Sequence, residues 1–309
     1  MITSLFRKST PLNYSLIIIS VFVFFFLFQM SEEASTFSWT LLLEKVGMLL
    51  VIFASLFAAN FVIKRNGLSK DSTYAALFLL LYYLFFPSVM SNPNLLLSNF
   101  FIVLALRRLI SLQNPKSIKE KIFDASLWVC VAALFHFWSF LFIILVFISI
   151  LFHAARDYRN WMIPFLAAFS ILTVFILFAL VIDESMIDLL LSRTTVDFTI
   201  DYFTDIYQNL ALSIFVSISL FFTAAVIIAL PAKPLLLQPP YKKIIVSFFI
   251  GSLIWIISPN KSNDVLIFTF VPLAFMATTH IEGMQNQIKQ EVTLAIFILS
   301  SLFLFFVQL

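Results

Sequence analysis

The chain has 309 residues, of which 62% are hydrophobic and 11% are charged. A typical soluble domain has about a quarter of its residues charged, so this composition excludes an ordinary soluble domain and indicates a multi-pass membrane protein. The net charge of +3 gives no reason to expect a nucleic-acid partner, because membrane topology accounts for the basic residues. The single cysteine, Cys130, excludes an intrachain disulfide and a cysteine metal cluster.

Apolar stretches that suit membrane-spanning helices follow one another along the whole chain. A spanning helix needs roughly 17 to 25 residues. On this basis we expect eleven spans, near residues 13–30, 40–63, 73–90, 94–112, 122–136, 138–155, 161–182, 208–230, 243–258, 264–281 and 291–308. The pattern predicts an all-α polytopic transmembrane bundle that forms one integral membrane domain over residues 1–309, with a possible division into 1–230 and 243–309 at a proline-rich connection.

The basic residues lie almost entirely in every second connection between these spans. Alternate connections hold 16 of the 19 basic residues, and the exceptions are Lys45, Arg193 and Lys261. Because basic loops stay cytoplasmic, we expect the N-terminus in the cytoplasm and, with an odd number of spans, the C-terminus at the outer face of a bacterial inner membrane. The first span lacks a small-x-small cleavage site before Ser31, so we expect it to remain uncleaved.

The acidic residues that follow the first span are candidates for catalysis. Glu32 and Glu33 lie at the predicted outer boundary, where a carboxylate would suit a general base for a hydroxyl acceptor. An ordinary solvated turn is the alternative. On the same side, Lys45, His136, Arg193 and Lys261 are the scarce groups that would have to clamp a lipid-linked phosphate.

Lys45 is the exception most worth testing, because an ionisable group inside a span is expensive and usually has a partner. Its neighbour Glu44 cannot face the same direction on a helix, so we expect that partner to come from another span. The three histidines do not predict a metal site. His136 is expected at an outer helix end, whereas His153 and His280 are expected at cytoplasmic ends.

The densest basic patch is expected on the inner side. It consists of Arg107, Arg108, Lys116, Lys119 and Lys121. Such a patch would bind anionic lipid headgroups or an acidic partner, although topology alone also explains it.

The connection from Asp183 to Tyr207 is the longest segment outside the predicted spans. Asp197, Asp201 and Asp205 recur at steps of four on one face, and apolar residues recur at steps of four and three on another, namely Val196, Ile200, Phe203, Tyr207 and Leu210. We therefore expect an amphipathic helix at the outer surface. Its basic residues are few for attraction to anionic headgroups, so burial against the protein's own helices is the alternative to a position on the bilayer. The three aspartates are either an ordinary solvated face or a site for a divalent cation, which would be the one cofactor.

Two blocks of sequence are familiar in combination. The segment from Ser91-Asn-Pro-Asn94 to Leu109, followed by the segment from Phe123 to Trp138, resembles an uncharacterised multi-pass inner-membrane protein family of Bacteroidota, and this likeness extends to Arg156-Asp-Tyr-Arg-Asn-Trp161. The same block is more loosely similar to the middle of GT-C glycosyltransferases. That resemblance implies transfer of a sugar from a polyprenyl-phosphate donor, with Glu32 or Glu33 in the position of the catalytic carboxylate. The first outer loop here is much shorter than theirs and contains no Asp.

Two functions follow as hypotheses. We expect a non-catalytic membrane subunit or assembly factor of an envelope or secretion complex, which contacts the bilayer and membrane-protein partners. The alternative is a GT-C-like glycosyltransferase that uses a polyprenyl-phosphate-linked sugar at the outer face. A transporter ranks last, since Gly251 and Pro272 are nearly the only breakers in the middle of a span.

Overall fold

The computed structural model describes residues 2–32, 39–199, 205–259 and 261–309. Helices make up 84% of the structure, and the described residues include no strand. The α-helices are α1 (Ile2–Phe6), α2 (Pro11–Glu32), α3 (Trp39–Arg65), α4 (Tyr74–Phe85), α5 (Pro93–Ile110), α6 (Ile118–Phe135), α7 (Ile143–His153), α8 (Arg159–Ile182), α9 (Ser185–Ser192), α10 (Ile206–Ala229), α11 (Gln238–Ile257), α12 (Ile267–Gly283) and α13 (Gln287–Val307). Short 3-10 helices are η1 (Pro87–Ser91), η2 (Ser111–Gln113), η3 (Phe137–Phe142), η4 (Leu230–Ala232) and η5 (Asn263–Leu266).

Within the described residues, eight helical segments are long and apolar enough to cross a membrane, which makes the chain a multi-pass membrane protein. The expected count of eleven is not confirmed. Three predicted spans contain helices that fall short: α4 has 12 residues, η3 and α7 together cover Phe137–His153, and α6 carries Lys119, Glu120, Lys121 and Asp124 in its first two turns. The sidedness of the termini stays a prediction.

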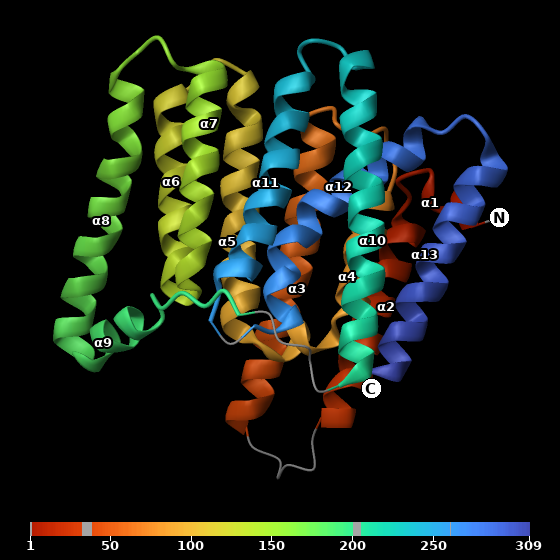
Figure 1. Cartoon of the computed structure of the whole chain (residues 1–309), viewed down its shortest axis with the longest axis horizontal. Coiled ribbons are helices and arrows are strands. Elements are labelled where there is room, and N and C mark those ends of the chain that lie inside the picture. Colours follow the sequence, from red (N-terminus) through yellow and green to blue (C-terminus); the bar gives the residue numbers. More distant parts are fainter. Residues whose placement is uncertain (1, 33–38, 200–204, 260) are drawn as a thin grey trace.

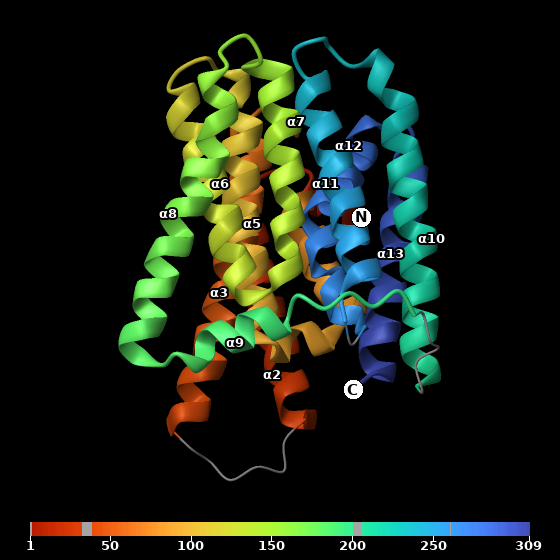
Figure 2. The ribbon, with the colours of Figure 1, turned by 60° about the vertical axis from the view of Figure 1, so that its left-hand side comes forward.

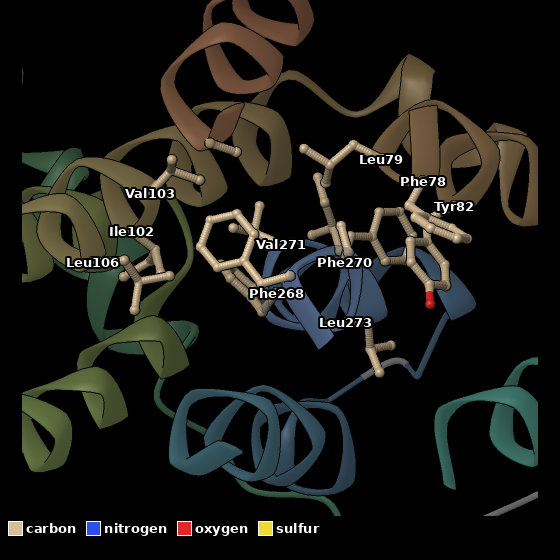
Figure 3. Packing of buried hydrophobic residues seen from close by; sticks show 14 of the residues in the cluster. Phe78, Leu79, Tyr82, Ile102, Val103, Leu106, Phe268, Phe270, Val271 and Leu273 are labelled. Carbon is tan, nitrogen blue, oxygen red and sulfur yellow. The ribbon is translucent and has the colours of Figure 1, made fainter. Parts of the chain in front are cut away.

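Helices α4 and α12 form the centre of the bundle. Every residue of α4 is buried, as expected for a helix that is apolar on all sides. Figure 3 shows Phe78 and Tyr82 of α4 beside Phe270 of α12. The Tyr82 and Phe270 rings stack with centroids 5.8 Å apart. Because α4 lies inside protein, its 12 residues do not have to match the thickness of a bilayer.

Gly251 allows α11 to lie directly against α12. A Cβ atom at this position would be 2.9 Å from Cγ2 of Thr269 and 3.0 Å from the backbone carbon of Phe268. The absence of a side chain at Gly251 therefore permits close contact between the two helices, as small residues do in membrane bundles. Helices on both sides of the proposed 230–243 boundary contribute to one buried cluster, and the division into two parts stays a prediction.

Other helices form the periphery. Helix α8 stands at one edge of the bundle in Figures 1 and 2, and only 11% of its most apolar window is buried. It packs against α6 and α7 and presents apolar side chains around most of its remaining circumference. The corresponding buried share is 28% for both α2 and α13. These surfaces suit the hydrocarbon of a bilayer.

The connections between helices gather at two ends. In Figure 1 the connections α5–α6, α7–α8 and α10–α11 lie toward the top, whereas α6–α7 and α11–α12 lie toward the bottom. We call the first end the basic end, because its connections hold most of the basic residues, and the other the opposite end.

The predicted amphipathic helix at the opposite end is wrong for the described residues. Helix α9 ends at Ser192, and residues 193–199 are not helical. The Asp197 carboxylate accepts hydrogen bonds from the backbone N–H and the hydroxyl of Thr199, at 2.8 Å and 2.7 Å. Such local bonds compete with helix formation, so the spacing of apolar residues was misleading here.

Candidate functional site

The non-helical segment Arg193–Thr199, which we call the strap, organises the polar residues of the opposite end. Figure 2 shows the chain after α9 running across the bundle toward α10. Arg193 Nη1 donates to the carbonyl oxygen of Phe135 at 3.2 Å, and Trp138 Nε1 donates to that of Thr195 at 3.1 Å. The backbone N–H of Asp197 donates to the carbonyl oxygen of Ile257 at 3.1 Å. The strap is thereby joined to the ends of both α6 and α11.

Lys261 fastens the far part of the strap. Its Nζ donates to the carbonyl oxygen of Asp197 at 2.7 Å and also to that of Thr199. The hydroxyl and backbone N–H of Thr199 hold the pKa of the Asp197 carboxyl below its ordinary value of 3.8, and the Lys261 charge acts in the same direction. The ammonium group is thus already engaged with the chain's own backbone.

His136 joins α6 to α11. Its Nε2 lies 3.2 Å from Oγ of Ser258, and this hydroxyl donates to the carbonyl oxygen of Ile254 at 2.7 Å. Because a serine hydroxyl has one hydrogen, Nε2 of His136 must carry the proton of the shared bond. The ring also packs against Phe268, with centroids 5.4 Å apart. These contacts give His136 a structural role at the end of α6.

A cavity of about 240 Å³ lies beside the strap. His136 and Arg193 line it together with Asn92, Asn94 and Trp138. The structure therefore brings two of the four predicted phosphate-clamp residues into one cavity, and a third, Lys261, donates to the neighbouring strap. Its amide, imidazole and guanidinium groups suit binding of a small polar group, and no carboxylate is among the described residues that line it.

The remaining candidates of the opposite end are separate from this cavity or unplaced. Lys45 lies in the second turn of α3 and is not among the residues that line the cavity. Glu32 is the last residue of α2, and Glu33 lies outside the described residues. A catalytic role for either glutamate stays a prediction.

The aspartates of the predicted cation site are not placed on one helix by the described residues. Asp197 belongs to the strap, Asp201 lies outside the described residues, and Asp205 caps α10 by accepting from the backbone N–H of Tyr207 at 2.9 Å. In the part of the chain that the structure describes, no group of three or more histidine, cysteine or carboxylate side chains is placed to hold a metal ion. Cation binding stays a prediction.

The predicted inner basic patch is largely engaged within the protein. Arg108 pairs with Asp124 at 2.8 Å, and Lys119 pairs with Asp157 at 3.1 Å. Lys121 Nζ donates to the carbonyl oxygens of Ser111 and Asn114, at 3.0 Å and 2.9 Å, and Arg107 lies over the ring of Phe61 at 5.0 Å. Lys116 remains exposed. These contacts join the α5–α6 connection to its neighbours.

Sequence reasoning missed one buried cation and one cavity. Lys243 is fully buried in the second turn of α11, where Nζ donates to the carbonyl oxygen of Leu109 at 2.6 Å. The prolines at the start of α11 indicate that the helix begins before Lys243 and that this lysine lies inside it, because proline suits the first turn of a helix. The missed cavity is a second one, which lies at the basic end. It combines residues from distant segments, so no local sequence pattern predicts it.

The chain matches no family model, no curated protein and no solved structure. The resemblances to the Bacteroidota family and to GT-C glycosyltransferases therefore remain predictions. Functional inference depends on the geometry of the chain itself.

Proposed function

We propose that the protein is a non-catalytic subunit or assembly factor of a membrane complex in the cell envelope, located in the bacterial inner membrane. One observation carries this proposal. Arg193 and Lys261, which an enzyme acting on a lipid-linked phosphate would need for its substrate, donate instead to carbonyl oxygens of Phe135, Asp197 and Thr199. A cation with these partners stabilises the fold and has less capacity left for a phosphate.

The peripheral helix α8 supplies a surface on which such a subunit would contact other membrane proteins. Its side chains Phe169 and Leu177 are 69% and 59% exposed. Helix α9 follows directly at the opposite end and exposes Leu189 and Leu191. The two helices together form an exposed apolar edge, and α8 packs against α6 and α7 on its other side.

Site-specific crosslinking tests this surface. A photo-reactive amino acid at Phe169 of α8 is expected to give a discrete crosslinked product with a protein partner in intact cells. The control is the same substitution at Phe22 of α2, which is 55% exposed and belongs to a different face. The absence of a protein adduct at Phe169, with lipid adducts at both positions, would contradict α8 as a partner surface.

The transferase alternative is favoured by the cavity that His136 and Arg193 line. Here the test is exchange of the predicted carboxylates, Glu32→Gln together with Glu33→Gln, in a strain where the variant remains inserted and abundant. A transferase requires surface glycans to change, because the general base is lost. Unchanged glycans together with a retained crosslink at Phe169 support the subunit.

A further inference from the structure

A cavity of about 700 Å³ opens at the basic end, between segments that are far apart in the sequence. Its walls come from the end of α1, the α3–α4 connection, the α10–α11 connection and the α12–α13 connection. Figure 1 places α1 and the latter two connections in the upper part of the bundle. The volume lies in the range of pockets that bind small molecules.

Cationic side chains dominate the charge of this cavity. Arg7, Lys70 and Lys233 line it, and Glu282 is the one carboxylate among the described residues that do so. Three positive charges against one negative charge leave a formal excess of +2. None of the three cations belongs to the ion pairs found among the described residues, which are Lys64–Asp71, Arg108–Asp124 and Lys119–Asp157.

Glu282 is occupied by donors from the chain itself. Its Oε1 accepts from the hydroxyls of Ser69 and Ser72 at 2.9 Å and 2.6 Å, and its Oε2 accepts from the backbone N–H of Lys70 at 2.9 Å. The carboxylate therefore holds the α3–α4 connection in place against the end of α12. This arrangement positions Lys70 at the cavity wall, where Nζ uses one of its three N–H donors on the carbonyl oxygen of Glu282 at 3.3 Å. Nζ of Lys233 lies 5.3 Å from the ring centroid of Tyr241.

Helix dipoles do not decide the charge of the site. The first residue of α13, Gln287, and the last residue of α12, Gly283, both line the cavity. The positive end of one helix and the negative end of the other are therefore close together and offset each other. The attraction for an anion comes from the three side chains.

A second, apolar cavity of about 190 Å³ adjoins the first. The two share Lys233, Tyr241, Thr279, Gly283 and Met284 in their walls. The second cavity continues along Ala225, Val226, Ala229 and Leu230, in and just after the last two turns of α10. A cationic chamber thus leads into an apolar one that runs beside a membrane-spanning helix.

From this combination we infer that the joined cavities bind a phosphate-bearing lipid at the basic end. Arg7, Lys70 and Lys233 contact the phosphate, and the wall formed by α10 receives the first part of the hydrocarbon chain. Charge-assisted bonds to phosphate and burial of methylene groups are both available at one site. The inference goes beyond the proposed function, because a lipid site at this end is compatible with either a subunit or a transferase.

The test uses the full chain in nanodiscs of equimolar phosphatidylglycerol and phosphatidylcholine, followed by native mass spectrometry of the released protein. Wild-type protein is expected to retain phosphatidylglycerol. The combined variant Arg7→Gln, Lys70→Gln and Lys233→Gln is expected to bind it on the order of 10- to 100-fold more weakly, since each cation near a membrane surface contributes to attraction.

A matched variant removes the same charge elsewhere at the basic end. Lys8→Gln, Arg65→Gln and Lys116→Gln change exposed cations that do not line the cavity, and retention of the lipid is expected to persist. Equal loss of lipid in both variants would overturn the site in favour of nonspecific surface charge. Unchanged retention in the cavity variant would overturn it as well.

Two further arms separate a lipid from free phosphate and from misfolding. Ala229→Trp places a bulky ring in the apolar wall, so it is expected to reduce lipid retention in a protein that still elutes as a single species. The charge-conserving variant Lys70→Arg with Lys233→Arg is expected to keep the lipid. Inorganic phosphate that displaces phosphatidylglycerol at comparable concentration would overturn recognition of the hydrocarbon chain.

Discussion

At the residue scale, the polar side chains of this membrane protein are used mainly to hold its own connections. Lys261 holds the strap, Lys121 holds the α5–α6 connection and Glu282 holds the α3–α4 connection, each through backbone groups. In a chain with few charged residues, each of these contacts helps to fix a loop. Loss of one such side chain is expected to have a local effect, because it leaves backbone groups without their donor or acceptor.

The strap provides the first residue-scale prediction. Lys261→Met keeps the apolar stem but removes the donor to the carbonyl oxygens of Asp197 and Thr199. We expect a local loss of about 1 to 3 kcal/mol and faster amide hydrogen exchange in residues 193–199. Lys116→Met, which removes an exposed lysine at the other end, should leave this exchange unchanged. Equal exchange in wild type and Lys261→Met would contradict the fastening role.

The Lys119–Asp157 ion pair predicts a pH dependence. The backbone N–H of Arg159 is the main cause that lowers the pKa of the Asp157 carboxyl below 3.8, and Lys119 adds to it. A lowered pKa means that the pair is intact above the ordinary value and is lost as pH falls through the lowered one. Carboxyl NMR titration should show the pKa rising in Lys119→Gln yet staying below 3.8. A wild-type value at or above 3.8 would refute this assignment.

At the element scale, the contact between α11 and α12 depends on one missing side chain. A Cβ at Gly251 would crowd Thr269 and the backbone of Phe268, whereas a Cβ at Gly47 in α3 would meet nothing within 4 Å. The same substitution therefore has opposite consequences at two helical positions. Backbone atoms cannot rotate away as a flexible side chain can, so α11 and α12 have to separate.

This difference gives a matched pair of variants. Gly251→Ala is expected to cost about 1 to 3 kcal/mol by overpacking and to lower the melting temperature in detergent. Gly47→Ala is expected to be neutral or to stabilise α3 by about 0.5 to 1 kcal/mol, because alanine favours the helix. Thermal unfolding of both proteins in the same detergent is the measurement. A melting temperature for Gly251→Ala at or above that of Gly47→Ala would disprove the close contact.

At the scale of the whole molecule, hydrophobic composition was enough to predict a multi-pass helical protein. Individual spans were less certain, because length and apolarity do not separate a lipid-facing helix from a buried one such as α4. The strap was mispredicted since Asp197 and Thr199 form local bonds that periodicity ignores. The cavity that combines Arg7, Lys70 and Lys233 depends on tertiary packing between distant connections, which no local pattern contains.

The arrangement of charge over the two ends supports a subunit that interacts through its membrane surfaces. At the opposite end Arg193 and Lys261 hold the strap. At the basic end several cations form internal pairs, and three others line a cavity suited to lipid phosphate. Catalysis at the opposite end would require Glu32 or Glu33 to reach the cavity beside His136. The subunit hypothesis requires instead a partner that remains bound when the membrane is dissolved gently.

Mass measurement of the purified protein in mild detergent tests this hypothesis most directly. The chain alone has a mass of 35.4 kDa. We expect a larger complex with a second protein in fixed stoichiometry, which dissociates when a bulky residue such as Trp replaces Ala168 on the partly exposed surface of α8. A homogeneous 35.4 kDa species without a protein partner, from cells whose surface glycans change in Glu32→Gln with Glu33→Gln, would contradict it.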